Sequence, residues 1–252
     1  MQHNPKELFT NLALHYGPQG WWPLPSCAGL PGYDPIGYHC DAAWLPEHPI
    51  GRFEIFCGAI LTQNTAWRNV SMVLQSLHKQ GLLDPDRLSG LSEAELALQI
   101  RSAGYHNQKA KKLSLALAAA HRGKWFESPA NAPTRESLLG LWGIGPETAD
   151  SMLLYIWGVP SFVVDAYTRR ILGRLGWDLG FIPASASYDT VRAWFMNGLE
   201  TVDKLELADS AKLYNEFHAL IVRHATVHCL AKARCAGCPL LAICSQRGIP
   251  LD

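Results

Sequence analysis

Four cysteines near the end of the chain have the type and spacing of a metal centre. Cys229, Cys235, Cys238 and Cys244 follow the pattern C-x5-C-x2-C-x5-C within sixteen residues. Four thiolates at this density fit a tetrahedral zinc ion or an iron–sulfur cluster. Since both centres accept four thiolates, the spacing leaves zinc, a [4Fe-4S] cluster and a set of free buried thiols open. The odd total of seven cysteines, without a secretory signal, argues against a disulfide framework.

A second candidate for chemistry is the carboxylate of Asp165. It follows the apolar run 162–164 and precedes a segment with helical periodicity. An aspartate at such a place caps the helix by accepting a backbone N–H. A functional role is compatible with a capping role, so both stay open for Asp165.

A glycine turn between two helical segments is the third candidate. A helix is predicted to end near Trp142, Gly143-Ile144-Gly145 forms a tight turn, and Pro146 opens the next helix. Glycines let the backbone approach a polyanion, and the N–H groups of the new helix can hold a phosphate. Taken alone, this motif is often only a turn.

The elements that carry these residues are predicted to be helices throughout. Apolar residues recur at helical spacing in 8–17, 53–80, 108–123 and 187–224, and Ser92 with Glu95 forms a capping-box pattern. Residues 18–51 contain seven prolines, so we expect an ordered loop there at most. The fold class predicted is all-α.

Composition and charge narrow the function classes. The chain has 252 residues, 48% of them hydrophobic and 17% charged, which is a globular composition. Its 22 basic and 22 acidic residues cancel, which excludes a binder that works by bulk charge. Locally, 101–124 and 217–247 hold basic residues and no acidic ones. Together with Arg169, Arg170 and Arg174 these tracts predict a phosphate-facing side, a solvated basic face being the alternative.

We expect a cytoplasmic protein, nucleoid-associated in a bacterium. The longest apolar stretch, 152–164, is interrupted by glycine and proline and is too short to span a bilayer. The first residues contain Glu7 and show no basic segment followed by an apolar block.

In combination, the glycine turn between helices, Asp165 at the start of a further helix and the four-cysteine segment resemble the helix-hairpin-helix DNA glycosylase superfamily of endonuclease III. The resemblance covers roughly residues 52–245. It implies two helical lobes with a DNA-binding cleft between them, a flipped-out base, a [4Fe-4S] cluster on the cysteines, and Asp165 as the essential carboxylate. We expect residues 1–50 to pack on the cluster lobe, 51–165 to form a helical lobe with the hairpin at 135–157, and 166–252 to form the cluster lobe.

The chemistry of such an enzyme suits Asp165. Breaking an N-glycosidic bond builds positive charge on the deoxyribose, and a fixed carboxylate stabilises that charge. The same group can orient or deprotonate the attacking water. The base must first leave the stack, which costs a few kcal/mol and is cheapest for damaged or mispaired bases.

The branch of the superfamily is indicated by two substitutions. Bifunctional endonuclease III-type enzymes carry a lysine nucleophile where this chain has Glu147, and no lysine occurs in 125–203. Without an amine no Schiff base forms there, which favours a monofunctional glycosylase. Glu147 would then either favour the positive end of its helix or line the base pocket. Adenine glycosylases of the superfamily carry a catalytic glutamate at the position of Ala59. The alanine therefore argues against that branch.

Three motifs, WWP at 21–23, LTQNT at 61–65 and GYHNQKAKKL at 104–113, are similar to bacterial 3-methyladenine glycosylases related to endonuclease III. An N-alkylated purine is cationic, and stacking on indole is worth up to about 2 kcal/mol when desolvated. The usual alternative for these tryptophans, and for the histidine of EFHALIV, is a place in the core. The resemblance implies a base pocket and duplex contacts at Trp21, Trp22, Trp67, Gln63, Asn64 and His218, and we add DNA-backbone contacts at Lys109, Lys111 and Arg169.

Three departures from this branch bear on the substrate. The first cysteine gap is five residues where the usual pattern has six, and the best-known alkylpurine enzymes lack the cluster. Their pocket lysine aligns with Leu220.

From the residues and the resemblance together, we predict a monomeric, monofunctional glycosylase acting on double-stranded DNA that contains an alkylated purine such as 3-methyladenine. Excision of uracil, mismatched thymine or oxidised pyrimidines, with or without AP lyase activity, stays open, as does a non-catalytic DNA-structure binder.

Overall fold

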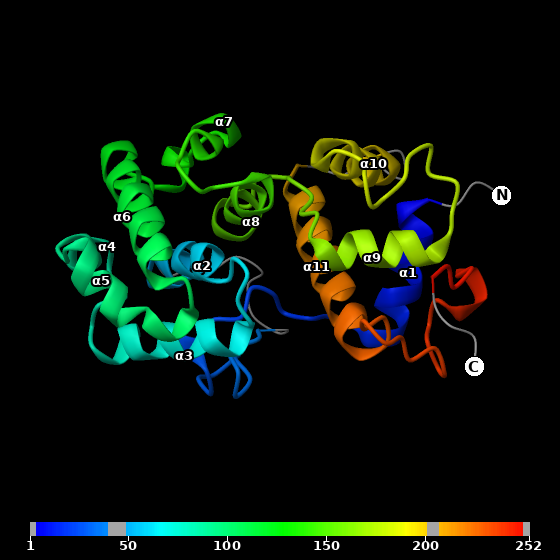
Figure 1. The fold of residues 1–252 in the computed structure, drawn as a ribbon, viewed down its shortest axis with the longest axis horizontal. Helices are drawn as coiled ribbons and strands as arrows, with labels where there is room; N and C mark the ends of the chain where they lie inside the picture. The colour runs from blue at the N-terminus through cyan, green and yellow to red at the C-terminus, as the bar shows by residue number, and fades with distance from the viewer. Residues whose placement is uncertain (1–3, 40–48, 201–206, 249–252) are drawn as a thin grey trace. The chain divides into compact units, whose positions relative to one another are not determined.

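The computed structural model describes residues 4–39, 49–200 and 207–248, and all regular elements in these ranges are helices (Figure 1). No strand occurs among these residues, which confirms the predicted all-α fold. None of the described helices is long and apolar enough to cross a lipid bilayer.

The chain forms two compact units. Met1–Gln19 and Pro160–Asp252 make up the first, called here the cluster unit, and Gly20–Val159 make up the second, called the hairpin unit. The sequence predicts that 1–50 packs as a whole on the cluster lobe, whereas the structure divides this segment after Gln19. The reason is that the described part beyond Gln19 buries Trp22 and Leu24 within the hairpin unit.

The hairpin unit is built around α2, Pro49–Leu61, whose residues from Phe53 onward are buried on every side. A helix that is apolar all round suits this central place. The predicted helical range 53–80 is divided in two, because a turn at 62–66 separates α2 from α3. The further helices are η1 Pro25–Cys27, α3 Trp67–Lys79, α4 Pro85–Ser89, α5 Glu93–Gln99, η2 Arg101–Ala103, α6 His106–Gly123, η3 Pro129–Asn131, α7 Arg135–Leu139 and α8 Pro146–Trp157.

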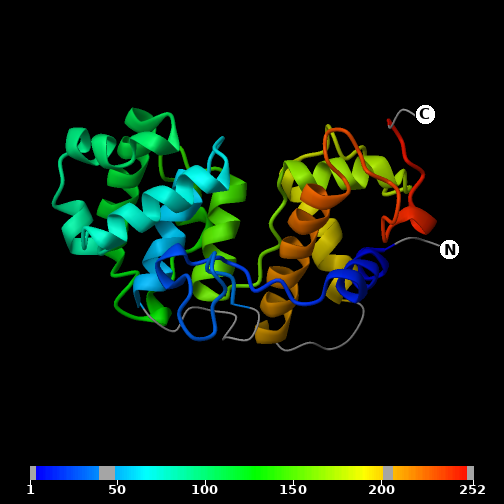
Figure 2. The same ribbon diagram turned by 90° about the horizontal axis from the view of Figure 1, so that it is seen from below.

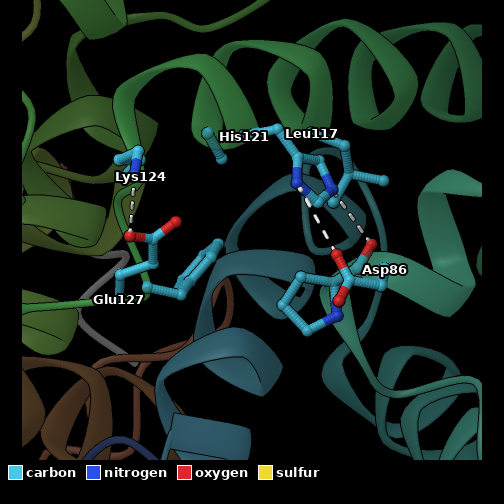
Figure 3. A pocket seen from close by; sticks show the side chains of 8 residues that line it. Asp86, Leu117, His121, Lys124 and Glu127 are labelled. Atoms are coloured by element: carbon cyan, nitrogen blue, oxygen red, sulfur yellow. Dashed lines mark hydrogen bonds and ion pairs between the residues drawn. The ribbon is translucent and has the colours of Figure 1, made fainter.

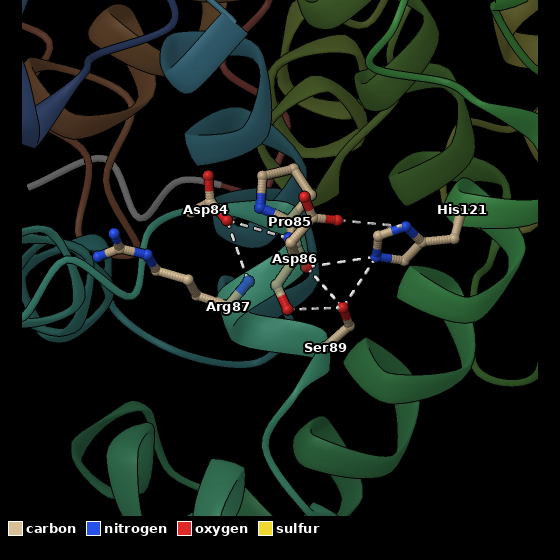
Figure 4. A network of polar contacts seen from close by, with 6 residues as sticks. All are labelled: Asp84, Pro85, Asp86, Arg87, Ser89 and His121. Carbon is tan, nitrogen blue, oxygen red and sulfur yellow. Dashed lines mark hydrogen bonds and ion pairs between the residues drawn. The ribbon is translucent and has the colours of Figure 1, made fainter.

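A hollow in the hairpin unit lies between α4 and the end of α6 (Figure 3). Its rim carries an ion pair between Lys124 and Glu127 at 3.3 Å, and Nδ1 of His121 lies 3.8 Å from Oδ1 of Asp86. His121 also lies 2.8 Å from the hydroxyl of Ser89, through Nε2 (Figure 4). These contacts hold the corner between the helices, and none of the predicted site residues lines the hollow.

The cluster unit consists of α1 Pro5–Tyr16, α9 Ala166–Leu175, α10 Tyr188–Glu200, α11 Leu207–Val227 and the short η4 Leu241–Ile243. α11 packs against α1 and α9 (Figures 1 and 2). The core is aromatic, with Phe162 stacked on Phe195 at 4.0 Å between ring centroids. The cysteine segment follows the end of α11.

Candidate active site

The glycine turn joins α7 to α8 as the sequence predicts. Gly143 has φ +80°, and a Cβ at this position would lie 2.5 Å from Cε of Lys112. Gly145 caps α8 with φ −93° and has nothing within 4 Å of a Cβ. No side chain caps this helix. The first glycine is thus required by the backbone, and the second leaves the helix N-terminus open to an anion.

Gln63 connects the turn between α2 and α3 to the hairpin. Its Nε2 donates to the carbonyl oxygen of Gly143 at 3.2 Å and to Oγ1 of Thr148 at 3.0 Å. Nζ of Lys112 donates to its Oε1 at 2.5 Å. The sequence predicts that Gln63 enters the DNA duplex, and in the structure its amide is bonded within the protein.

Lys109 requires a correction. Its side chain is buried, at 2% exposure, and Nζ donates to the carbonyls of Leu61 and Ala103 at 2.7 and 2.8 Å and to Thr65 Oγ1 at 2.5 Å. Burial, together with the charge of Lys112, lowers its pKa to about 8. The predicted contact with the DNA backbone is wrong for Lys109, because all three N–H donors bind protein. Its position one turn before buried Leu113 was the available signal.

Lys109 holds together two segments that present exposed residues. Asn64 and Tyr105 both have positive φ, at 53° and 47°. Asn64 is exposed, and the ring of Tyr105, which the sequence analysis did not single out, is 67% exposed. The structure therefore gives Asn64 the accessibility that its predicted role needs, and adds Tyr105 at the segment on the other side of the Lys109 amine.

Lys111 lies at the surface beside Trp142. It is exposed, and Nζ stands 4.7 Å from the ring centroid of Trp142. Trp142 is itself 51% exposed and directly precedes Gly143. A cation and an indole thus flank the open end of α8, where Glu147 occupies an exposed place in the first turn.

The arginines of α9 contact loops of the cluster unit. Nη1 of Arg169 donates to the carbonyls of Pro183 and Ala186 at 2.6 and 3.0 Å. Arg170 Nε donates to the carbonyl of Cys229 at 2.8 Å, and Arg174 donates to Cys229 Sγ at 3.3 Å. Through these contacts the guanidinium groups brace loops of the cluster unit, while the three arginine side chains remain half-buried.

The three predicted tryptophans do come together. Trp22 is buried, and its ring lies 5.5 Å from Trp67 and 5.1 Å from Tyr155, both edge to face. Trp21 lies 6.0 Å from Tyr155 and, like Trp67, is half-buried. The buried indole nitrogens of Trp22 and Trp67 have no hydrogen-bond partner. Trp22 is therefore mainly core, and the accessible indole surface belongs to Trp21 and Trp67.

A buried glutamate positions the segment that carries Trp21 and Trp22. Glu54 of α2 accepts from the backbone N–H of Ser26 at 3.0 Å and from its hydroxyl. Burial raises the pKa of Glu54 to about 7 despite these bonds. Nε2 of His39 lies 2.9 Å from the carbonyl of Trp22. The loop at 20–39 is thus ordered by specific contacts, while 40–48 lie outside the described residues.

Asp165, in the cluster unit, caps α9 as predicted. Its Oδ1 accepts from the backbone N–H and the hydroxyl of Thr168 at 2.7 and 2.8 Å. Its Oδ2 lies 3.6 Å from Nε2 of His218, which is buried on α11. Burial favours the neutral acid, but His218 and Thr168 outweigh it, so the pKa of Asp165 is lower than usual. The carboxylate is ionised, and its side chain remains 13% exposed.

The four cysteines line one small cavity at the end of α11, with Ile171, Leu175 and Leu240 as apolar walls. No three of the described His, Cys, Asp and Glu side chains lie close enough together to hold a single metal ion. Burial and the neighbouring cysteines raise the pKa of Cys238. The backbone N–H of Gln246 donates to Cys244 Sγ at 3.4 Å. Four sulfurs around a cavity, with N–H donors to sulfur, fit an iron–sulfur cluster.

Comparison with known proteins agrees with these features. The family model described as HhH-GPD superfamily base excision DNA repair protein matches residues 57–196. A provisionally named DNA repair glycosylase of Methanocaldococcus jannaschii is 34% identical over 247 residues, 96% of each chain. Endonuclease III of Bacillus subtilis is 28% identical over 82% of this chain and 86% of its own. Among solved structures, 3-methyladenine DNA glycosylase MagIII of Helicobacter pylori, bound to 1,N6-ethenoadenine, has a TM-score of 0.65 with 26% identity, covering 89% of this chain and 98% of that one.

Proposed function

Because the chain belongs to the HhH-GPD superfamily of base excision DNA repair proteins, we propose that it is a monofunctional DNA glycosylase for alkylated purines. It would act as a monomer on double-stranded DNA and hydrolyse the N-glycosidic bond of a flipped-out base such as 3-methyladenine. The observation that carries the catalytic part is the geometry of Asp165. Its carboxylate is fixed through Oδ1 by the helix cap, faces His218 through Oδ2, and is accessible in part.

The reaction asks two things of this carboxylate. As the bond from the purine nitrogen to C1′ breaks, the electron pair leaves with the base and positive charge develops on the sugar. The fixed negative charge of Asp165 stabilises that state. Water then adds to C1′, and its proton passes to Asp165 or to solvent. An N-alkylated purine is positively charged while it is attached to the sugar. It therefore leaves as a neutral base, and no general acid is needed to protonate it.

The proposal that lyase activity is absent rests on the lack of a suitably placed lysine amine. A Schiff base needs an amine that can reach C1′, and the second hairpin helix carries Glu147 in the place of the family's nucleophile. Lys109 does not supply a substitute, since its amine is buried with three acceptors. Borohydride trapping on a duplex with an abasic site tests this, and a covalent protein–DNA product would contradict it.

The choice of an alkylated purine is supported by the tryptophans. Two half-buried indoles, Trp21 and Trp67, belong to one aromatic cluster of the hairpin unit. Indole faces attract a cationic purine more strongly than a neutral base. The similar MagIII structure is described with an ethenoadenine bound. The hairpin N–H groups and Lys111 would hold the DNA backbone without reading its sequence.

A [4Fe-4S] cluster is proposed for the cysteine cavity, held by Cys229, Cys235, Cys238 and Cys244. Bound there, it would supply one-electron chemistry and a rigid link between the cysteine loop and α11. Purified protein should be brown and contain iron and inorganic sulfide. A colourless protein with one zinc ion per chain would overturn this assignment.

The decisive experiment measures bases released from DNA. Alkylated, deaminated and oxidised duplexes are incubated with the protein, and free bases are identified by mass spectrometry. We expect alkylated purines, and no release by Asp165→Asn, which keeps a good helix cap and should still bind the duplex. Release of uracil, thymine or oxidised pyrimidines instead would change the substrate, and unchanged behaviour of Asp165→Asn would indicate a protein without this catalysis.

A further inference from the structure

A chain of polar contacts in the cluster unit leads from α1 to one of the cluster cysteines. Oη of Tyr16, the last residue of α1, lies 3.0 Å from Nδ1 of His224 on α11. Nε2 of the same imidazole lies 3.8 Å from Sγ of Cys238. His224 is buried, at 1% exposure, and lines the cavity of the four cysteines. The proposed glycosylase reaction uses none of these contacts.

The direction of these contacts follows from the sulfur. A cysteine that holds iron is a thiolate, which can only accept hydrogen bonds. The nitrogen facing it must then carry hydrogen, because a lone pair on Nε2 would be repelled by the negative sulfur. In an uncharged imidazole this leaves Nδ1 as an acceptor for the hydroxyl hydrogen of Tyr16. In a protonated imidazole Nε2 also carries hydrogen, so its role as the donor to sulfur does not depend on the charge of the ring.

On this basis, and resting on the proposed cluster, we propose that His224 donates a hydrogen bond to the ligand sulfur of Cys238 and that Tyr16 orients it for this role. His224 is then a positioning and tuning residue for the cluster. The pattern is that of a metal-site histidine whose second nitrogen is fixed by a further partner.

The expected consequence is electrochemical. A donor to a ligand sulfur stabilises the state with more negative charge, which is the reduced state of any one-electron couple of the cluster. Loss of the donor should therefore move the midpoint potential to more negative values. A tenfold change in the redox equilibrium corresponds to about 59 mV for one electron, and we expect a shift of about this size.

The experiment uses the full chain with its cluster and compares four variants. Tyr16→Phe removes only the hydroxyl that orients the ring, His224→Phe removes the donor, and His224→Gln keeps an N–H that can reach sulfur. His15→Phe is the control for the loss of a neighbouring ring, because His15 is exposed, contacts the rings of Tyr16 and His228, and acts on His224 through its charge. Thin-film voltammetry gives the midpoint potential. Resonance Raman spectra in H2O and D2O report the iron–sulfur stretches, and circular dichroism checks folding.

The inference is supported when Tyr16→Phe and His224→Phe shift the potential negatively, His224→Gln restores part of the shift, and the deuterium effect on the stretches is smaller than in the wild type. Where His224→Phe fails to assemble a cluster, Tyr16→Phe decides. A loaded protein whose potential in Tyr16→Phe equals that of His15→Phe overturns the hydrogen-bond assignment and leaves the cluster in place. A wild-type protein without iron and sulfide overturns both, so the two failures are distinguishable.

Discussion

Nε2 of His218 lies 3.6 Å from Oδ2 of Asp165, while Oδ1 of the same carboxylate caps α9. One oxygen thus has a structural task and the other faces an imidazole. Because the cap holds Oδ1, the oxygen that faces His218 is Oδ2. This division lets one aspartate serve both the helix and the proposed reaction.

His218→Gln should move the acidic limb of the pH profile to higher pH. His218 helps to keep the pKa of Asp165 low, so its removal raises that pKa and the carboxylate protonates earlier as the pH falls. The stability that an ionised Asp165 contributes is present above its unfolded pKa, about 3.9, and is lost as pH falls through the lower folded value. Single-turnover base release between pH 4 and 8 measures the shift. An unchanged acidic limb would exclude His218 as a partner of the catalytic carboxylate.

Gly143→Ala and Gly145→Ala should separate folding of the hairpin from contact with DNA. A methyl group at Gly143 meets Lys112 and a positive φ, so we expect a loss of about 1–3 kcal/mol in stability. A methyl group at Gly145 meets nothing, so stability should change by less than about 1 kcal/mol. Affinity for duplex DNA should nevertheless fall several-fold for Gly145→Ala, since the methyl group stands where the backbone would approach. Urea denaturation and fluorescence anisotropy provide the two measurements, and wild-type affinity of Gly145→Ala would argue against phosphate binding at this turn.

Lys111→Met should weaken DNA binding and Lys109→Met should lower stability, although the two residues are only two positions apart. Lys111 is exposed beside Trp142, so its loss should weaken DNA binding and reduce the slope of log K against log salt by about 1. Lys109 is buried, so its loss removes a hydrogen bond from each of the carbonyls of Leu61 and Ala103 and should cost about 1–3 kcal/mol of stability. Its salt slope should match that of the wild type. A reduced slope in Lys109→Met would restore the contact with DNA that the structure excludes.

Glu54→Gln should remove a pH dependence of folding. The folded pKa of Glu54 is raised to about 7, so the native state keeps a proton that the unfolded chain releases near its ordinary pKa. The stability that this group contributes is complete below about pH 4.5 and is lost as the pH rises through 7. The loss in the free energy of unfolding over this pH range is up to about 3 kcal/mol. Relative to wild type, the glutamine variant should therefore gain stability between pH 5 and pH 8. Parallel free-energy curves for the two proteins from urea denaturation would show that Glu54 does not titrate in this range.

Local signals account for what the sequence determined by itself. The helices, the capping box of Ser92 and Glu95, the cap at Asp165 and the turn at Gly143 follow from residues within one or two helical turns of each other. The cysteine spacing is equally local, and all four side chains line one cavity. Such features need no knowledge of what packs against them, which is why they could be predicted.

Only the tertiary structure decided which polar groups are available to a ligand. Lysine, arginine and glutamine are residue types that bind DNA in many proteins. In this structure Lys109, Arg169 and Gln63 are each bonded to protein atoms at least six residues away. The segment after Gln19 was likewise assigned by packing, because Glu54 of α2 binds Ser26. A side chain's partners depend on which distant backbone groups the fold leaves unsatisfied, and no periodicity in the sequence records that.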